Sequence, residues 1–563
     1  MRTKKYIFAL AIAVMSCSLE EKSYMQVDDS YIEDTSLAEN ILLGVYTPMN
    51  TDGVYRLNLT MLFDSPNDQI RGEGSSLDGQ RTEAANAFSP SSAYVQDTWA
   101  GLYKGVYNAN SFLEMMEEKM PSMSEKEREL GTVFVAEARA LRALYYFELV
   151  RWFGHVPLLT STKQSRQPYD KFVQADPADV YGFIEADLKF AVENLPWADA
   201  DALRKDNSFR FSKGAAMGLL TKVYATWAGY PLLDSEKWAK AASVASELIN
   251  SGHHSLLPDF DQLWQNSGNN VWDSRESLIE QSYWSPLSTT TSCGRVGNFN
   301  GVRAARGSIR GFFHFAFMRV VPTFIAGWKD YKQDKRWAIS FADYEYKVGG
   351  PSTLVIKTVG GVPNTPVTFE MAMDEDAPVD WRRTYGYMLF PRKWDTEVYV
   401  KDENQIYDQN LTNVNWYVLR YADVLLLYAE ALNERDGAPS AEAFNAVNMV
   451  RRRGFGLDIY TESATADLPA TLGYEDFRKA IQDERAYELA FEGHRRQDLV
   501  RWGIYYDTVQ NTYTDMGIWH PEAPASYIGA LYTKKGKHEL LPIPQREKDL
   551  CTKFEQNPGW DGE

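Results

Sequence analysis

One stretch near the C-terminus, from Glu475 to Gly503, constrains the fold more than any other part of the chain. Its apolar residues recur at helical spacing, and they are Phe477, Ile481, Leu489, Leu499 and Trp502. Glu488 and Glu492 lie one helical turn apart, and Glu492 lies one turn before Arg496. We therefore expect a long helix with a charged side, interrupted near Gly493, because glycine there favours a break or a close approach of the backbone.

Helical periodicity runs through much of the remaining chain, at residues 36–50, 96–118, 133–153, 177–194, 212–229, 235–250, 417–434 and 440–453. The segment 133–153 is apolar almost all round, so we expect it to be central and buried. The segments 212–229 and 235–250 form an antiparallel pair across a Gly-Tyr-Pro turn. Such a pair cannot bury its apolar face alone, so pairs must stack as they do in an α-solenoid. The sequence therefore predicts a mainly α fold.

The composition changes between residues 255 and 410, where Gly, Asn, Ser, Thr and aromatic residues replace the helical pattern. Three segments there, 278–284, 353–361 and 367–376, indicate short strands or extended chain. No Pro/Ser/Gly-rich linker or low-complexity tract separates independent units. We predict one body over residues 17–563, with a helical scaffold at 36–254 and 411–563 and a loop-rich variable region with short strands at 255–410.

The first sixteen residues have the pattern of a secretory signal, with a basic start followed by the apolar run YIFALAIAVM. A small residue then precedes Cys17, as in bacterial lipoproteins, whose cysteine becomes the lipid-bearing first residue. The alternative is an ordinary signal with Cys17 incidental. We predict a signal peptide at 1–16 and lipidation at Cys17. The sequence leaves open whether the other two cysteines, Cys293 and Cys551, pair with each other.

The charge of the chain bears on the class of partner. The formal net charge is −18, and removal of Arg2, Lys4 and Lys5 with the signal takes it to −21. Nonspecific nucleic-acid binding needs clustered Lys and Arg to neutralise phosphates, so this charge argues against it. It suits a surface protein that meets neutral or cationic partners.

Several motifs, in this order along the chain, resemble the SusD/RagB family of outer-membrane lipoproteins from Bacteroidetes. Besides Cys17, they are VFVAEARALRALYYFELVRWFGHVPL (133–158), YVLRYADVLLLYAEALNE (417–434), AVNMVRRRGFGL (446–457), the DERAYELAFEGHRRQDLVRWG run and ELLPIPQREKDLCTKFEQNPGW (539–560). The resemblance implies a tetratricopeptide-like helical scaffold. It also implies a protein anchored in the outer membrane and facing the cell exterior, which captures glycan and delivers it to a SusC-like TonB-dependent transporter, without a cofactor. The alternatives are a peptide-binding RagB-like lipoprotein, a secreted glycoside hydrolase and a surface adhesin.

In this family the ligand contacts come from the loop after the first helix and from the variable region, which directs the search for binding residues. Loops on a rigid scaffold often carry such residues, and carbohydrates need flat aromatic faces with planar hydrogen-bonding groups. The loop at 62–79 and the variable region contain such side chains. Our candidates are Asp68, Arg71, Tyr283, Trp284, Phe299, Arg303, Phe312 and Trp381. Tyr283 and Trp284 are adjacent in an extended segment, so we expect one to pack inward and the other, Trp284, to face outward.

Catalysis and metal binding were the competing interpretations of the charged residues. Glu488, Glu492 and His494 resemble catalytic groups, but residues on one helix face cannot flank a sugar from two sides, and neighbouring arginines would keep the carboxylates ionised. Motifs such as GxSxG, HExxH and the P-loop do not occur. The acidic turn DEDAPVD (374–380) lacks the glycine of an EF-hand, so we favour a solvated turn over a calcium site. We therefore predict a binding protein with no catalytic residues, no metal and no cofactor.

Overall fold

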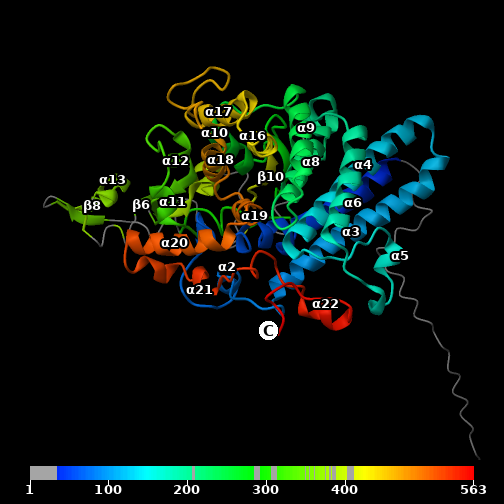
Figure 1. Ribbon diagram of the computed structural model, residues 1–563, viewed down its shortest axis with the longest axis horizontal. Coiled ribbons are helices and arrows are strands. Elements are labelled where there is room, and N and C mark those ends of the chain that lie inside the picture. Colours follow the sequence, from blue (N-terminus) through cyan, green and yellow to red (C-terminus); the bar gives the residue numbers. More distant parts are fainter. Residues whose placement is uncertain are drawn as a thin grey trace, which may run out of the picture.

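The computed structural model of the protein describes residues 35–205, 209–284, 292–305, 313–348, 350–353, 356–359, 362–374, 376–378, 382, 389–401 and 411–562. Long helices dominate it, as predicted (Figure 1). These are α1 (Thr35–Tyr46), α3 (Ala93–Lys119), α4 (Glu125–Phe153), α6 (Pro177–Asn194), α8 (Lys213–Ala228), α9 (Glu236–Asn250), α16 (Tyr421–Asp436), α17 (Ala441–Gly454), α18 (Tyr474–Glu488) and α20 (Tyr505–Trp519).

Shorter helices connect them. They are α2 (Gln80–Ala84), α5 (Thr162–Ser165), α7 (Ala202–Lys205), α10 (Phe260–Gly268), α11 (Pro322–Ala326), α12 (Lys335–Ser340), α13 (Phe369–Met373), α15 (Thr396–Tyr399), α19 (Arg495–Arg501), α21 (Gly529–Tyr532) and α22 (Gln545–Leu550). Single turns used below are η2 (Thr47–Asn50), η3 (Asp52–Arg56), η4 (Asn58–Leu62) and η6 (Tyr169–Lys171). These short elements lie mostly where the chain leaves one long helix and enters the next.

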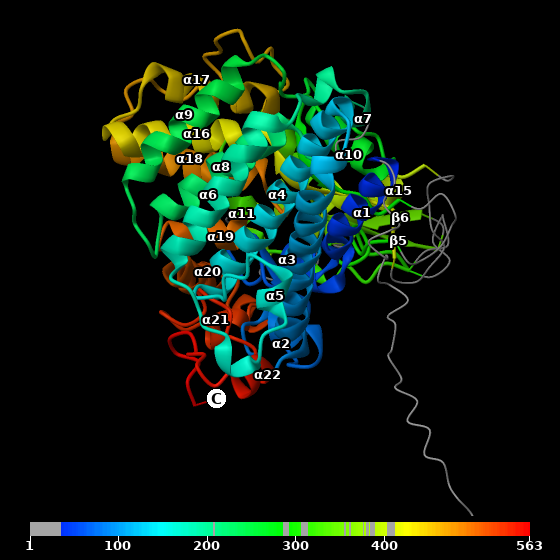
Figure 2. The ribbon, with the colours of Figure 1, turned by 90° about the vertical axis from the view of Figure 1, so that its right-hand side faces the viewer.

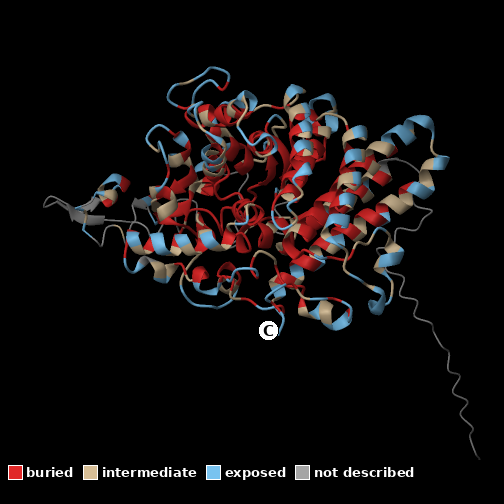
Figure 3. Ribbon diagram, viewed as in Figure 1, coloured by how far each residue is buried: buried red, intermediate tan, exposed pale blue. Residues whose placement is uncertain are grey.

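The long helices pack in sequence order, each against the next. Helix α3 packs on α4, α4 on α6, α6 on α8 and α8 on α9, and α9 then meets α16, which contacts α17 and α18 (Figures 1 and 2). Helix α4 begins with a capping box, in which Ser124 and Glu127 exchange hydrogen bonds that satisfy the first backbone N–H groups. Its second half is buried almost completely, so it forms the centre of the first helical layer, as its apolar sequence predicts (Figure 3).

The strands are short and form five antiparallel pairs. These are β1 (Ile70–Gly72) with β3 (Met318–Val320), β2 (Ser277–Gln281) with β10 (Trp416–Arg420), β4 (Phe341–Ala342) with β9 (Phe390–Pro391), β5 (Tyr344–Lys347) with β6 (Gly350–Thr353), and β7 (Ile356–Val359) with β8 (Val362–Pro366). Seven of these ten strands lie between Met318 and Pro391. Short strands in the variable region were therefore correctly predicted.

Two of the predicted boundaries are wrong. Residues 417–434 are not one helix, because Trp416–Arg420 pairs with β2 as β10 and α16 begins only at Tyr421. The aromatic and β-branched residues of WYVLR fit a buried strand. Residues 367–376 contain helix α13 rather than a strand, since the Thr368 side chain accepts from the N–H of Met371 and helix-forming residues follow it.

The C-terminal stretch is two helices with a break between them. Helix α18 ends at Glu488, and α19 begins at Arg495. Phe491 and Gly493 take the left-handed conformation, with φ of 67° and 71°. A Cβ atom on Gly493 would lie 3.2 Å from the carbonyl oxygen of Thr60. Both the break and the close backbone approach predicted at this glycine are therefore present.

The break places carboxylates of this stretch inside a cluster of buried charges, which we call the ionic cluster. Its members are Glu276, Asp334, Arg336, Lys393, Arg420, Arg453, Glu484, Glu488 and Glu492, and all are at most 4 % exposed. Arg420 donates to Glu276, Glu488 and Glu492 at 2.7–3.0 Å, and Arg453 donates to Glu276 and Glu488. The cluster joins β10 to helices α12, α17 and α18.

Candidate functional site

A pocket beside the end of strand β2 has the composition of a small-ligand site. It encloses about 650 Å³ and is lined by the end of α1, turn η2 and residues on both sides of β2. Its lining residues are Leu43, Tyr46, Thr47, Asn50, Phe209, Asn270, Trp272, Glu280, Gln281, Ser282, Trp284 and Ser292. We call it the Trp284 pocket. Aromatic rings combined with planar amides are what orient a ligand that has both apolar faces and hydroxyl groups.

Tyr283 and Trp284, which follow the end of β2, differ sharply in burial. Tyr283 is fully buried against Gly294, and its backbone N–H donates to Asn415 Oδ1 at 3.1 Å. Trp284 is 37 % exposed and lines the pocket. The outward member of the pair is thus the tryptophan, as expected from the sequence. Of the two rings, this one is available to a ligand.

Three further aromatic rings of the pocket, those of Tyr46, Phe209 and Trp272, were missed by sequence reasoning. Phe209 and Trp272 pack edge to face, with ring centroids 5.6 Å apart, and Tyr46 packs against Phe209 at 5.8 Å. This chain of rings fixes the half-buried indole of Trp272 beside the pocket. The signal in the sequence was an aromatic residue in the Asn-rich turn that precedes β2, which is the same kind of signal that selected Trp284.

Glu280 supplies a buried carboxyl group to the lining of the pocket. Its Oε2 accepts from Ser277 Oγ at 2.7 Å, and its Oε1 accepts from Asn415 Nδ2 at 2.9 Å. Burial raises the pKa of this carboxyl to about 7, although the two hydrogen bonds lower the pKa in part. Burial therefore favours the protonated form of this carboxyl compared with an exposed glutamate.

The amides around the pocket form a connected hydrogen-bond network. Asn415 Nδ2 also donates to Asn270 Oδ1 at 3.1 Å, and Ser282 Oγ donates to the same oxygen at 3.1 Å. Asn50 Nδ2 donates to the carbonyl of Ser292 at 2.9 Å, while its Oδ1 has no hydrogen-bond partner among the described residues. The pocket thus has a polar lining held by hydrogen bonds, with one buried acceptor beside it that has no partner among the described residues.

The other predicted contact residues lie outside this pocket. Asp68 forms an ion pair with Arg495, at 2.6–2.8 Å, and Arg303 forms one with Glu345. Arg71 is 3 % exposed in β1, where its guanidinium donates to the carbonyl of Ser526. Each of these side chains already has a polar partner within the protein.

Phe299 is also buried, with Phe315 and Phe317 around it at centroid distances of 6.1 and 6.3 Å. Phe315, which we did not single out, is the exposed ring of this group, at 40 %. The predicted residues Phe312 and Trp381 lie outside the described residues. A ligand contact at any of the eight candidate residues, Trp284 included, therefore stays a prediction.

The residues that resembled a catalytic set lie in the interior. Glu488 and Glu492 are at most 1 % exposed, and both accept hydrogen bonds from Arg420. Burial alone would raise the pKa of Glu488, but Arg453, Arg420 and Arg336 together lower it to about 2. His494 is 7 % exposed beside Lys222, and burial together with that ammonium lowers its pKa well below the usual value. These groups are buried and have charged partners within the protein.

The remaining expectations concern metals, cysteines and the membrane. Among the described residues no group of three or more His, Cys, Asp or Glu side chains is arranged to hold a metal ion, and Asp380 of the acidic turn lies outside those residues. Cys293 is a buried thiol that donates to Asn413 Oδ1, and Cys551 is a second buried thiol. A search of the described helices finds none with the length and apolar character needed to cross a bilayer.

Comparison with known proteins agrees with this architecture. The "SusD family" matches residues 325–560, and the family described as "Starch-binding associating with outer membrane" matches residues 18–225. The crystal structure of a SusD homolog from Bacteroides thetaiotaomicron has 46% sequence identity and a TM-score of 0.88, and the match covers 94% of this chain and 98% of that one.

Two more distant relatives also match over nearly their whole length. A laminarin-binding SusD-like protein of known structure is 26% identical, with a TM-score of 0.66 over 93% of this chain and 99% of that one. SusD-like protein P25 of Formosa agariphila is 25% identical, over 96% of this chain and 95% of its own. With matching families along both halves and a homolog that covers almost the entire chain, this protein belongs to the SusD family.

Proposed function

We propose that this protein binds a neutral oligosaccharide in the Trp284 pocket. The observation that carries the proposal is the combination, in one pocket, of the exposed indole of Trp284 and the half-buried indole of Trp272 with the amides of Asn50 and Asn270. Indole faces suit the C–H side of a sugar ring, and planar amides suit its hydroxyl groups. The laminarin-binding relative and the family description that names starch support this choice of ligand class.

The charge of the pocket supports a neutral ligand. None of the twelve described lining residues is cationic, and one of them, Glu280, is acidic. The nearby cations are already paired, since Arg210 pairs with Glu137 and Glu39, and Arg275 pairs with Asp273. By sequence, residues 206–208 and 285–291 contain no Lys or Arg. An anionic sugar would therefore lose hydration without gaining a cationic partner.

We further propose that the protein acts as a lipoprotein on the outer face of the outer membrane, anchored through Cys17. It would deliver its glycan to a SusC-like TonB-dependent transporter. The lipoprotein-like signal before Cys17 and the family description that mentions the outer membrane support the location. Membership of the SusD family supports the transporter as partner.

A glycan array with the purified mature chain tests the ligand class. The expected result is retention of one or more neutral glycans, followed by saturable binding in calorimetry without change to the glycan. Binding of acidic glycans alone would contradict neutrality. Binding of peptides but of no glycan would support a RagB-like function, and release of shorter products would indicate a hydrolase.

A further inference from the structure

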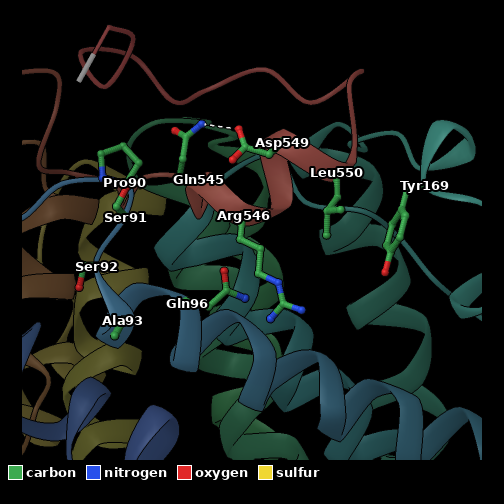
Figure 4. Close-up of a pocket in the computed structure, with 10 residues that line it drawn as sticks. All are labelled: Pro90, Ser91, Ser92, Ala93, Gln96, Tyr169, Gln545, Arg546, Asp549 and Leu550. Atoms are coloured by element: carbon green, nitrogen blue, oxygen red, sulfur yellow. Dashed lines mark hydrogen bonds between the residues drawn. The ribbon is translucent and has the colours of Figure 1, made fainter.

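A second pocket lies away from β2, between the start of α3, turn η6 and helix α22. It encloses about 590 Å³ and is lined by Pro90, Ser91, Ser92, Ala93, Gln96, Tyr169, Gln545, Arg546, Asp549 and Leu550 (Figure 4). We call it the α22 pocket. It shares no lining residue with the Trp284 pocket.

One wall of the α22 pocket is held in place by hydrogen bonds between α22 and α3. The backbone N–H of Gln545 donates to the carbonyl of Pro90 at 2.9 Å, and Gln96 Nε2 donates to Glu547 Oε1 at 3.0 Å. Gln545 Nε2 donates to Asp549 Oδ1 at 2.7 Å within α22. The backbone of the pocket is therefore set before any ligand arrives, which lowers the cost of binding.

Two exposed side chains of this pocket, Arg546 and Tyr169, can contact a ligand, and a third, Gln96, has an acceptor without a partner among the described residues. Arg546 takes part in no hydrogen bond or ion pair with any described residue, although a guanidinium carries five N–H donors. Gln96 Oε1 is a buried acceptor that lacks a partner among the described residues. Tyr169 is 55 % exposed, and Phe172 packs beside its ring at 6.3 Å.

The arrangement of these side chains defines the kind of ligand. Figure 4 shows Arg546 extending from α22 towards the first turns of α3, with Gln96 on one side of it and Leu550 and Tyr169 on the other. A ligand must therefore accept hydrogen bonds from a guanidinium and offer an apolar face to a phenol ring. The hydroxyl groups of a sugar accept hydrogen bonds and its C–H side is apolar, so a sugar ring meets both demands.

The charges in the α22 pocket also favour an uncharged ligand. Arg546 and Asp549 are the charged lining residues and cancel each other, and the other two charged residues of the same short helix, Glu547 and Lys548, also cancel. A phosphate or carboxylate would meet the Asp549 carboxylate as well as the arginine. A peptide would need either an open strand edge or a row of apolar pockets for its side chains. Leu550 and Pro90 are the two aliphatic lining residues larger than alanine, so the lining does not offer such a row.

Lining residues of the two pockets lie close together in the structure. Asn50 lines the Trp284 pocket, and three residues later Gly53 packs directly on the backbone of Asp97. Asp97 follows Gln96, which lines the α22 pocket. With a maximum of 3.6 Å per residue, this path limits the distance between the Cα atoms of Asn50 and Gln96 to about 20 Å.

We propose that the α22 pocket is a second, weaker binding site for neutral saccharide, which contacts a distal part of the polysaccharide held in the Trp284 pocket. This inference rests on the proposed function. Two linked weak sites raise the effective affinity for a long chain much more than for a short one. The protein should therefore prefer polysaccharide to its short oligosaccharides, and that preference should depend on Tyr169 and Arg546.

Hydroxyl-radical footprinting with readout by mass spectrometry tests this directly on the wild-type protein. The probes are five neutral polysaccharides, namely laminarin, soluble starch, xyloglucan, β-mannan and arabinan, and each is first screened by retardation in native gels. The retarding polysaccharide should lower labelling of both Trp284 and Tyr169 at least threefold. Tyr460, which is 74 % exposed and lines neither pocket, is the internal control and should not change.

Three variants, tested in the same native gels, distinguish the contribution of the aromatic ring from that of the charge and from a loss of folding. Tyr169→Ala and Arg546→Ala should each weaken retardation at least fivefold, and Tyr169→Phe, which keeps the ring, should retain most of it. Binding of trisaccharides in calorimetry should be unchanged in all three variants. Both mutated side chains are exposed, so melting temperatures should stay within a degree or two of the wild type.

Each contrary outcome has a defined meaning. Protection of Trp284 without protection of Tyr169 would overturn the second site and leave the proposed function intact. Protection of Tyr169 by a peptide mixture, with no polysaccharide effective, would overturn the saccharide assignment. Absence of any retardation or protection by the five polysaccharides and by the array glycans would overturn both proposals together.

Discussion

Arg420 and Glu492 form a two-point ion pair in the protein interior, with Nε to Oε2 at 2.7 Å and Nη2 to Oε1 at 2.9 Å. Lys393 also donates to Glu492, at 2.9 Å. Glu492→Gln removes the charge that compensates these two buried cations, so it should lower the free energy of unfolding by about 3 kcal/mol. Glycan affinity should stay the same, because the ionic cluster does not line the Trp284 pocket.

Thermal melting and calorimetry check this prediction, with Glu475→Gln in helix α18 as a control. The Glu475 side chain is 74 % exposed, so its loss should change stability by less than about 0.5 kcal/mol. A Glu492→Gln protein that melts like the wild type but no longer binds glycan would show that the cluster has a role in binding.

Trp284→Ala should abolish oligosaccharide binding in calorimetry and leave the fold intact. Stacking of a ring on an aromatic side chain contributes on the order of 1–3 kcal/mol, by analogy with bases on aromatic residues. A loss of about 1.4 kcal/mol weakens binding tenfold, which is enough to take a weak glycan below detection. If the variant binds as the wild type does, then the sugar platform lies elsewhere, and the exposed Phe315 is the next ring to test.

Tyr283→Ala should have the reverse effect and cost about 3–5 kcal/mol of stability, because a fully buried ring would be lost. Tyr283→Phe is the matched control. The Tyr283 hydroxyl is buried without a hydrogen-bond partner among the described residues, so its removal should be neutral or slightly stabilising. Circular dichroism and urea unfolding measure both variants, and equal losses in the two would mean that the hydroxyl group is the important part.

Glu280→Gln should make stability less dependent on pH. Burial raises the pKa of Glu280 from an ordinary 4.5 to about 7, so the folded state holds the proton more tightly than the unfolded state does. Wild-type stability should therefore fall as pH rises between about 4.5 and 7, by up to on the order of 3 kcal/mol. The free energy of unfolding is measured for both proteins at pH 5 and at pH 8. The two values should be similar at pH 5, and the variant should be the more stable protein at pH 8. A pH-independent difference would contradict this.

Gly493→Ala should destabilise the break between α18 and α19 by about 1–3 kcal/mol. Gly493 has a φ of 71°, and the added methyl group would crowd the carbonyl of Thr60. Gly473→Ala is the control, because a Cβ atom there meets nothing within 4 Å and φ is −84°. Urea unfolding of both variants measures the difference, and equal stability would show that the left-handed conformation carries no cost for alanine here.

Cys17→Ala should release the protein from the outer membrane, because this cysteine would carry all the acyl chains. Fractionation of cells that lack the partner transporter measures the effect, with wild-type protein in the same cells as the control. If the variant still sediments with outer membranes in those cells, the lipoprotein assignment is wrong.

The sequence predicted best those elements whose signals are local. Helix α6 begins and ends at the predicted residues because Asp176 caps its first turn and Pro177 occupies the first helical position. The opposite orientations of Tyr283 and Trp284 followed from their adjacency in an extended segment, and the Ser/Thr-rich segment after Trp284 indicated that this ring is the outward one. In both cases neighbouring residues contain all the information that is needed.

Features that combine distant segments were beyond sequence reasoning. The Trp284 pocket brings together Phe209, Trp272 and the end of α1, and no periodicity links these segments. Arg420 looked like part of a helix, because its strand is recognisable only through its pairing with β2. Arg71 looked like a loop residue for the same reason, because β1 can be recognised as a strand only from its pairing with Met318–Val320.

The ionic cluster also fixes the order in which this chain can finish folding. Arg336, Lys393, Arg420 and Arg453 precede Glu484, Glu488 and Glu492 in the sequence, so the cations leave the ribosome first and three of their carboxylates last. Until those carboxylates arrive, closing the core would bury four cations with only Glu276 and Asp334 to compensate them. A nascent or truncated chain that ends before α18 should therefore remain open and accessible to proteases, so completion of the core reports that synthesis has passed Glu492.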